Sequence, residues 1–268
     1  MTILQALILG IIQGLTEFIP VSSTAHLLIG GRLLGLPSSG LMFSFLVLVQ
    51  LGTLLSLIVL FWSDLLGLVR AFFARPFSTP QNRLAWNLLI ATLPAALLGF
   101  LLRDAVESLF KQPLLEAAVR LLAAALLLSL AEWLGQRIRN LDSMSRLDAL
   151  IIGLFQVLSV FPGASRSGTT ISGGMLRGFD RPAAARFAFL LSVPIMLGAG
   201  GYQAVEAVRE AGLVAWLPAI VVGFAAAAAV GWLAVRWLLR YLNKHSLYAF
   251  AVYCAAAGAI ALVFHFLP

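Results

Sequence analysis

Residues 14–26 read GLTEFIPVSSTAH, and this polar stretch interrupts an apolar region that extends from residue 3 to residue 36. Proline does not continue a helix interior, and serine and threonine favour helix starts. Neither half of the region reaches the roughly 20 residues that a helix needs to cross a bilayer. The pattern therefore predicts two half-helices that enter a membrane and return as a re-entrant hairpin.

A second apolar region, residues 147–178, is interrupted in the same manner by PGASRSGTT at residues 162–170. Its two halves are also too short to cross a bilayer. Glycine, proline and serine at membrane depth are tolerated where the backbone lines a protein-enclosed site. This region therefore predicts a second re-entrant hairpin.

The composition excludes an ordinary soluble domain. Hydrophobic residues make up 61% of the chain, charged residues only 11%, and the mean hydropathy is +1.00, whereas soluble domains carry about 25% charged residues. We predict an all-α integral membrane protein, a single membrane domain over residues 1–268 with two re-entrant helical hairpins and six transmembrane helices. The six predicted spans are residues 41–62, 84–102, 114–134, 187–205, 212–235 and 247–266.

The two halves of the chain share residue spacings. Gly-x-x-Gln at residues 10–13 recurs at 153–156, and Phe-x-Phe-Leu-x-x-Val at 43–49 recurs at 187–193. Both pairs are separated by nearly the same number of residues, which indicates a duplicated unit of one hairpin and three spans. An odd number of crossings forces the second copy into the opposite orientation, so the prediction is two inverted-topology repeats.

The predicted repeats cover residues of about 1–140 and about 141–268, and the basic residues predict their orientation. Lysine and arginine concentrate on the cytoplasmic side of membrane proteins. Twelve of the 18 basic residues fall on one predicted side: Arg70, Arg75, Arg83, Arg137, Arg139, Arg146, Arg177, Arg181, Arg186, Arg236, Arg240 and Lys244. Both termini are therefore predicted outside the cytoplasm, and the net charge of +7 reports topology, not nucleic-acid binding.

The first break gathers polar side chains that are costly inside a membrane and that usually mark function there. Gln13 and Glu17 are four residues apart and share one helical face. Ser22 or Ser23 is suited to cap the next half-helix, and His26 lies about one turn into it. A structural interpretation, in which a serine caps the helix and Glu17 and His26 form a buried pair, stands beside a catalytic one.

The second break has the features of an anion site. Its glycines free backbone N–H groups, and the helix that follows directs its positive end at the same place. Arg166 adds a guanidinium fork suited to phosphate, and Thr170 lies one turn further on. The alternative is an arginine that reaches the membrane interface, with glycines that serve helix packing.

Residues 14–26 and 162–170 resemble the two signature motifs of the undecaprenyl-diphosphate phosphatase family, the bacitracin-resistance proteins, and QLG at 50–52 and ISGG at 171–174 fit as well. The resemblance implies hydrolysis of undecaprenyl diphosphate to undecaprenyl phosphate and inorganic phosphate. This reaction recycles the lipid carrier of cell-wall (peptidoglycan) synthesis at the bacterial plasma (inner) membrane. It implies four catalytic residues, Glu17, Ser23, His26 and Arg166. It implies six substrate-binding residues, Gln13, Ser22, Thr24, Ser165, Ser167 and Thr170.

The resemblance leaves the nucleophile and the metal open. Ser23 or His26 attacks or positions the attacking water, with Glu17 as base or as metal ligand. The family's activity implies a divalent cation, Mg²⁺ or Ca²⁺. Many members carry glutamate where this chain has Gln13, and the neutral side chain weakens any scheme in which two carboxylates hold a metal.

The expected partners are a polyprenyl diphosphate lipid substrate and membrane lipids, with no nucleic acid, and a homodimer is left open. Two other function classes are kept beside the phosphatase. A polyprenyl-phosphate transporter or flippase fits because inverted repeats with broken helices are common in transporters. A passive lipid-binding scaffold would have no need of Glu17 and His26.

Overall fold

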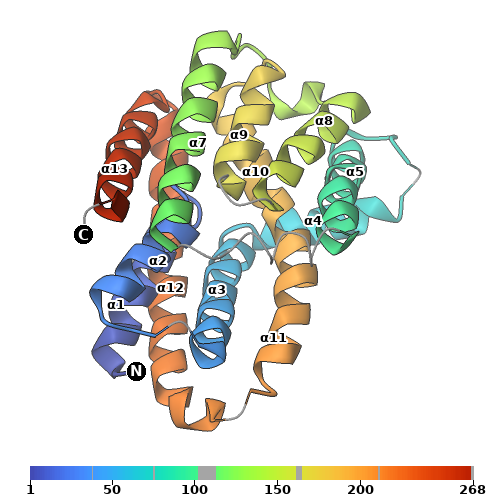
Figure 1. Cartoon of the computed structure of the whole chain (residues 1–268). Coiled ribbons are helices and arrows are strands. Elements are labelled where there is room, and N and C mark those ends of the chain that lie inside the picture. The colour runs from blue at the N-terminus through green and yellow to red at the C-terminus, as the bar shows by residue number, and fades with distance from the viewer. Residues whose placement is uncertain (38, 75, 102–112, 161–164, 211, 267–268) are drawn as a thin grey trace.

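The computed structural model describes residues 1–37, 39–74, 76–101, 113–160, 165–210 and 212–266. These residues form a helical molecule (Figure 1), and the strand-type pairing found among them is an isolated bridge between Arg139 and Phe179. The predicted all-α class is confirmed for this part of the chain.

The first half of the chain consists of the first hairpin and the helices that follow it. A helix after the first predicted span was not predicted, because this stretch, with Arg70, was assigned to the basic connection that follows the span. The elements are α1 (Ile3–Thr16), α2 (Ser23–Leu33), α3 (Gly40–Leu60), α4 (Trp62–Phe72), α5 (Pro80–Leu101) and α7 (Pro113–Leu134).

The second half has the same order of a hairpin followed by long helices. A short π-helical segment keeps the fourth predicted span continuous between two α-helices. The elements are η1 (Leu141–Ser143), α8 (Arg146–Val157), η2 (Leu158–Val160), α9 (Arg166–Leu176), α10 (Arg181–Ile195), η3 (Met196–Gly200), α11 (Gly201–Ala207), α12 (Leu213–Leu242) and α13 (Tyr248–Phe266).

Among the described residues, five continuous helices are long and apolar enough to cross a membrane. They are Gly40–Leu60, Leu114–Leu134, Arg181–Ala207, Leu213–Leu242 and Tyr248–Phe266, and each contains most of a predicted span. The predicted span 84–102 lies within α5 as far as Leu101, and residue 102 lies outside the described residues.

One helix extends past the span predicted for it. The fifth span was predicted to end at residue 235, before a run of basic residues, but α12 continues to Leu242. Leu238 and Leu242 are buried in the main hydrophobic core. Because tertiary packing continues past the apolar stretch, the helix does so as well.

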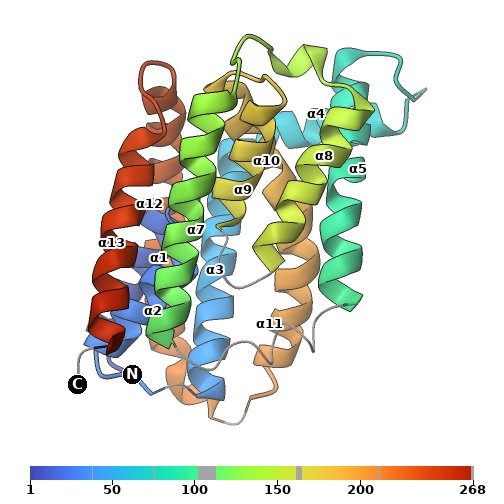
Figure 2. The same cartoon turned by 45° about the horizontal axis from the view of Figure 1, so that its top comes forward.

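Both predicted helix breaks are present. The first hairpin changes direction between Thr16 and Ser23, and the second lies between η2 and α9, where residues 161–164 are outside the described part of the chain. In Figure 2 the pair α1 and α2 occupies one half of the molecule's height, and the pair α8 and α9 occupies the other half. The two hairpins thus approach each other from opposite ends.

Each hairpin is packed closely against a long helix of the other half of the chain. A Cβ atom added to Gly10 of α1 would lie 2.4 Å from the carbonyl oxygen of Gly223 in α12. A Cβ atom added to Gly153 of α8 would lie 2.5 Å from the carbonyl oxygen of Ala91 in α5. These two glycines are the pair that the sequence repeat aligned, so equivalent positions make equivalent helix contacts.

The two ends of the molecule differ in what they carry. Both termini and the connection from α11 to α12 lie at one end, and the connections from α7 to α8 and from α12 to α13 lie at the other (Figures 1 and 2). We call this second end the arginine-rich end, because Arg137, Arg139 and Arg177 lie in or beside its connections.

Candidate active site

The first hairpin presents a carboxylate at its tip. Glu17 follows directly after α1 and is only 8% exposed. Its Oε2 atom accepts a hydrogen bond of 2.9 Å from Nε2 of Gln13 and one of 2.7 Å from Oγ of Ser23. The predicted shared face of Gln13 and Glu17 is confirmed, and it includes the hydroxyl of Ser23 across the break.

The second hairpin meets this carboxylate with an arginine. Arg166, in the first turn of α9, forms an ion pair and a hydrogen bond with the other oxygen of Glu17, Oε1. Ser167 Oγ lies 3.4 Å from the carbonyl oxygen of Glu17 and 3.5 Å from that of Ile19. The two broken tips therefore meet inside the molecule, as the sequence predicted.

The start of α9 is built from small polar residues. Ser165 caps the helix by accepting a hydrogen bond from the backbone N–H of Gly168, and its hydroxyl lies 3.1 Å from that of Ser167. A Cβ atom added to Gly168 would lie 3.1 Å from Cβ of Ser165 and 3.8 Å from Cβ of Pro20. The positive end of α9 is thus directed at the break of the first hairpin.

Thr170 lies beneath this tip with its hydroxyl bonded inside the helix. It is 1% exposed, and its Oγ1 donates to the carbonyl oxygen of Arg166 at 2.8 Å. This hydrogen bond holds the backbone carbonyl of Arg166 in place and so stabilises the first turn of α9, from which the guanidinium extends.

The start of α2 differs from an ordinary helix cap. Ser22 occupies the N-cap position with φ of 66°, a left-handed conformation that is unusual for serine, and its side chain makes no capping bond. Such strain is concentrated at functional sites. Thr24 is exposed. Among the described residues, no hydrogen bond joins its side chain to Glu17, Ser23 or Arg166.

His26 is held by two partners, and neither is Glu17, with which the structural interpretation of the sequence paired it. Its Nδ1 lies 2.9 Å from the carbonyl oxygen of Ser22, and its Nε2 lies 2.7 Å from the hydroxyl of Tyr253 in α13. A carbonyl only accepts hydrogen bonds, so Nδ1 carries the proton and Nε2 of the neutral ring accepts from the tyrosine. Tyr253 is 227 residues away in sequence and lies in an apolar span without a motif.

Oxygen atoms beside Glu17 suit a hard divalent cation. Oε1 of Gln13 is buried without a hydrogen-bond partner next to the Glu17 carboxylate. Carboxylate and amide oxygens are ligands of Mg²⁺ and Ca²⁺. Within the described ranges, no group of three or more His, Cys, Asp or Glu side chains is placed to hold a metal. These donors fit a cation that takes its remaining ligands from water and a bound phosphate.

The residues described above all lie in a part of the chain that matches a known protein family. The model of one family, described as bacitracin resistance protein BacA, matches residues 6–260. The chain belongs to the BacA family. Both interrupted hairpins lie inside the matched region, and so do Glu17, Ser23, His26 and Arg166. The apolar helices make this BacA member a multi-pass membrane protein.

Relatives of this BacA member resemble it over nearly their full length. A protein of Anaeromyxobacter sp. (strain K) is 46% identical over 266 residues, which cover 97% of this chain and 90% of the relative. A protein of Thermomicrobium roseum is 41% identical over 98% of both chains, and one of Moorella thermoacetica is 40% identical over 97% of both. All three relatives are named undecaprenyl-diphosphatase.

Proposed function

We propose that this chain is an undecaprenyl-diphosphatase of the bacterial plasma membrane, which recycles the lipid carrier of cell-wall synthesis. The observation that carries the proposal is the contact between Arg166 and Glu17, which joins an anion-binding helix start to a carboxylate that already accepts a hydrogen bond from Ser23. The names of the relatives supply the substrate.

The second hairpin is the proposed diphosphate site. Arg166 and the N–H groups at the start of α9 bind the phosphate oxygens and stabilise the charge that develops at phosphorus. Ser165, Ser167, Thr170, Ser22 and Thr24 complete the expected binding residues. An anionic substrate competes with Glu17 for Arg166, so binding frees one carboxylate oxygen at the moment when a base is needed.

The contacts favour Ser23 as the nucleophile. Ser23 Oγ already donates to Glu17 at 2.7 Å, the arrangement of an activated hydroxyl and its base. In the proposed step Ser23 Oγ bonds to the terminal phosphorus, its proton passes to Glu17, and the bond to the bridging oxygen breaks, which releases undecaprenyl phosphate. Water then attacks the phosphoserine, Glu17 returns its proton to Ser23 Oγ as the bond between phosphorus and Ser23 breaks, and inorganic phosphate leaves with the oxygen and hydrogens of the water.

His26 keeps the alternative nucleophilic role open, because its Nε2 is unprotonated when the ring is neutral. Trapping the phosphoenzyme with labelled substrate and identifying the labelled residue distinguishes the two schemes. Label on Ser23 supports the serine route, and label on His26 overturns it.

A divalent cation, Mg²⁺ or Ca²⁺, is part of the proposal, with Glu17 and Oε1 of Gln13 as its protein ligands. When bound it supplies charge neutralisation for the diphosphate. Arg166 and the α9 amides orient the phosphate in either case.

The proposed architecture is two inverted repeats of about residues 1–140 and 141–268, each with one re-entrant hairpin and three spans. The equivalent contacts of Gly10 with α12 and of Gly153 with α5 support it. The arginine-rich end is the proposed cytoplasmic side, with both termini outside.

The test measures phosphate release from undecaprenyl diphosphate in detergent. Glu17→Ala, His26→Ala and Arg166→Ala are each expected to lose at least about a hundredfold in rate. Arg70→Ala, at an exposed position in α4, is the control for loss of an arginine and should remain active. Native rates in the three variants contradict the site assignment.

The inverted hairpins also suit a polyprenyl-phosphate flippase, because two re-entrant tips that meet are common in transporters. That function predicts movement of the lipid between leaflets of a vesicle without release of phosphate. Phosphate release by the purified native chain contradicts a flippase that lacks hydrolysis.

A further inference from the structure

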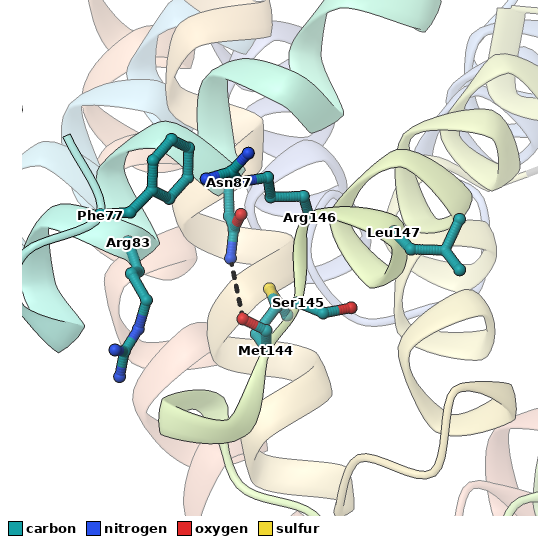
Figure 3. Close-up of a pocket in the computed structure, with 7 residues that line it drawn as sticks. All are labelled: Phe77, Arg83, Asn87, Met144, Ser145, Arg146 and Leu147. Atoms are coloured by element: carbon teal, nitrogen blue, oxygen red, sulfur yellow. Dashed lines mark hydrogen bonds between the residues drawn. The ribbon is translucent and has the colours of Figure 1, made fainter.

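A pocket of about 430 Å³ lies at the arginine-rich end, away from the candidate active site. It is formed where α5 begins, beside the connection that leads from η1 into α8. Figure 3 shows its lining, which includes Phe77, Arg83, Asn87, Met144, Arg146 and Leu147. No carboxylate is among the described residues that line it.

The two arginines of this pocket are unlike five arginines in the segment that leads from α7 into α10. Those five each form an ion pair with a carboxylate, of Glu132, Asp148 or Asp64: Arg137, Arg139, Arg177, Arg181 and Arg186. Arg83 and Arg146 have no ion pair within the described residues. Two guanidinium groups without counter-charge at one cavity leave it complementary to an anion.

The pocket is a built feature of the fold. The guanidinium of Arg146 lies 3.6 Å from the centre of the Phe77 ring, which also lies 6.0 Å from the ring of Trp86. Phe77 has φ of 59°, a left-handed conformation that a bulky residue adopts only when its surroundings impose it. The aromatic cluster therefore fixes the position of Arg146.

A buried amide in the lining is only partly satisfied. Asn87 is 1% exposed, and its Nδ2 donates to the carbonyl oxygen of Met144 at 3.2 Å. Its Oδ1 is buried without a hydrogen-bond partner. An orphaned acceptor in a polar cavity is costly, so this atom calls for a ligand that carries a donor such as a hydroxyl group.

The helices that lead away from the pocket face lipid. Exposed leucines recur every three or four residues on both: Leu89, Leu93, Leu97 and Leu101 of α5, and Leu147, Leu150 and Leu154 of α8. Such rows occupy one face of each helix. The pocket thus lies where an apolar, lipid-facing surface meets a charged end, which is the level of phospholipid headgroups.

We propose that this pocket binds the headgroup of an anionic phospholipid with hydroxyl groups, of the phosphatidylglycerol type. Arg83 and Arg146 hold the phosphate, Oδ1 of Asn87 accepts from a headgroup hydroxyl, and the acyl chains remain in the surrounding bilayer. The inference does not depend on the proposed phosphatase activity, since none of these residues belongs to the hairpin tips.

Binding is measured by native mass spectrometry of the whole chain, purified in detergent and titrated with phosphatidylglycerol or with phosphatidylcholine of the same acyl chains. The native chain should bind phosphatidylglycerol more tightly. The double variant Arg83→Gln/Arg146→Gln should lose about tenfold in that affinity, whereas Arg70→Gln, which removes an exposed charge at the same end, should keep it. Equal loss in both variants, or no preference in the native chain, overturns the proposal.

Two further arms distinguish lipid binding from a folding defect and from an inorganic anion site. Arg83→Lys/Arg146→Lys keeps the charges and should recover part of the affinity, which a general folding defect would not allow. The thermal unfolding temperature of the double variant in detergent reports on its fold. Sodium phosphate in millimolar amounts should not displace phosphatidylglycerol; displacement by free phosphate would show an inorganic anion site and would overturn the lipid assignment.

Discussion

The hydroxyl of Tyr253 joins the last membrane helix to the first hairpin through His26. Tyr253→Phe removes this hydrogen bond and keeps the ring. A neutral hydrogen bond contributes about 1 kcal/mol, so we expect kcat to fall about fivefold with KM nearly unchanged. Phosphate-release kinetics test this.

The control for Tyr253 is Tyr248→Phe. Tyr248 also lies in α13 and has no side-chain hydrogen bond among the described residues. If both variants lose activity equally, a positioning role of Tyr253 at His26 is excluded, and the loss reflects packing of the helix.

Arg166 contributes geometry as well as charge. A lysine there keeps the positive charge but lacks the planar fork that binds two phosphate oxygens. Arg166→Lys should therefore retain expression and lose about a hundredfold in kcat/KM. Arg70→Lys is the matched exposed control. Near-native kinetics of Arg166→Lys would mean that only charge matters at the start of α9.

The sequence was sufficient to predict which polar residues meet, because they interrupt apolar segments where polar groups are costly. Glu17, Ser23 and Arg166 were all identified in this way. Tyr253 was not, because a tyrosine in an apolar span has the same appearance whether its hydroxyl reaches lipid headgroups or a histidine. The left-handed conformation of Ser22 was also not predicted, since serine gives no signal for it.

At the scale of elements, two glycines allow the hairpins to pack. Gly10→Ala and Gly153→Ala each place a Cβ atom within 2.5 Å of a backbone carbonyl oxygen of another helix. We expect each change to lower the free energy of unfolding by about 1–3 kcal/mol. Thermal unfolding in detergent measures the effect.

Gly198→Ala and Gly201→Ala are the controls for these glycines, because a Cβ atom at either position meets nothing within 4 Å. Both should unfold at the native temperature or slightly above it. Equal effects at all four positions would show that the hairpin contacts are looser than the structure has them, and would remove the support that Gly10 and Gly153 give to the repeat.

Asp148, near the start of the second hairpin, forms ion pairs with Arg139 and Arg177 of the arginine-rich end. Burial alone would raise its pKa, but hydrogen bonds from Arg139, Ser145 and Arg177 outweigh burial and hold the pKa well below its usual range. The carboxylate is 1% exposed and both arginines are partly exposed. Asp148→Asn should therefore destabilise the protein by about 2 kcal/mol at pH 7.

The pH dependence of this effect follows from the lowered pKa. The stability that Asp148 contributes is complete at neutral pH and is lost as the pH falls below the ordinary carboxyl pKa of 3.8. The gap between native and Asp148→Asn unfolding temperatures should be wide at pH 7 and narrower at pH 3. Asp142→Asn, an exposed neighbour, should show no gap, and a pH-independent gap at Asp148 contradicts the ion-pair explanation.

The long apolar stretches were sufficient to predict where most of the long helices lie. They were not sufficient to predict where each helix ends or where its geometry changes. The fourth span contains the π-helical segment Met196–Gly200, for which glycine-rich sequence gives no specific signal. Helix α12 runs past its apolar stretch because Leu238 and Leu242 pack in the core. Arg236 and Arg240 lie within α12, because basic residues do not by themselves end a helix.

At the scale of the whole molecule, two half-helices from opposite ends meet because each carries what the other lacks. The tip at Glu17 is acidic, the tip at Arg166 is cationic, and neither charge is tolerable alone in an apolar interior. Their pairing therefore holds the hairpins together and creates a polar site inside an apolar molecule. In the proposed mechanism, an anion that binds Arg166 replaces one half of this pair, which couples substrate binding to release of the base.

The topology prediction can be tested on the intact molecule in cells. Both termini and the connection from α11 to α12 share one end, and the connection from α12 to α13 lies at the other (Figure 2). Arg209→Cys and Lys244→Cys place a thiol at an exposed position at each end. The native Cys254 is buried, so its background labelling should be low.

A membrane-impermeant maleimide added to spheroplasts should label Arg209→Cys at once and Lys244→Cys only after permeabilisation, because basic connections stay in the cytoplasm. The native chain, with Cys254 alone, is the control. The reverse pattern would place both termini in the cytoplasm. The first hairpin, with Glu17 and His26, would then enter from the cytoplasmic side, which is the reverse of the proposed orientation.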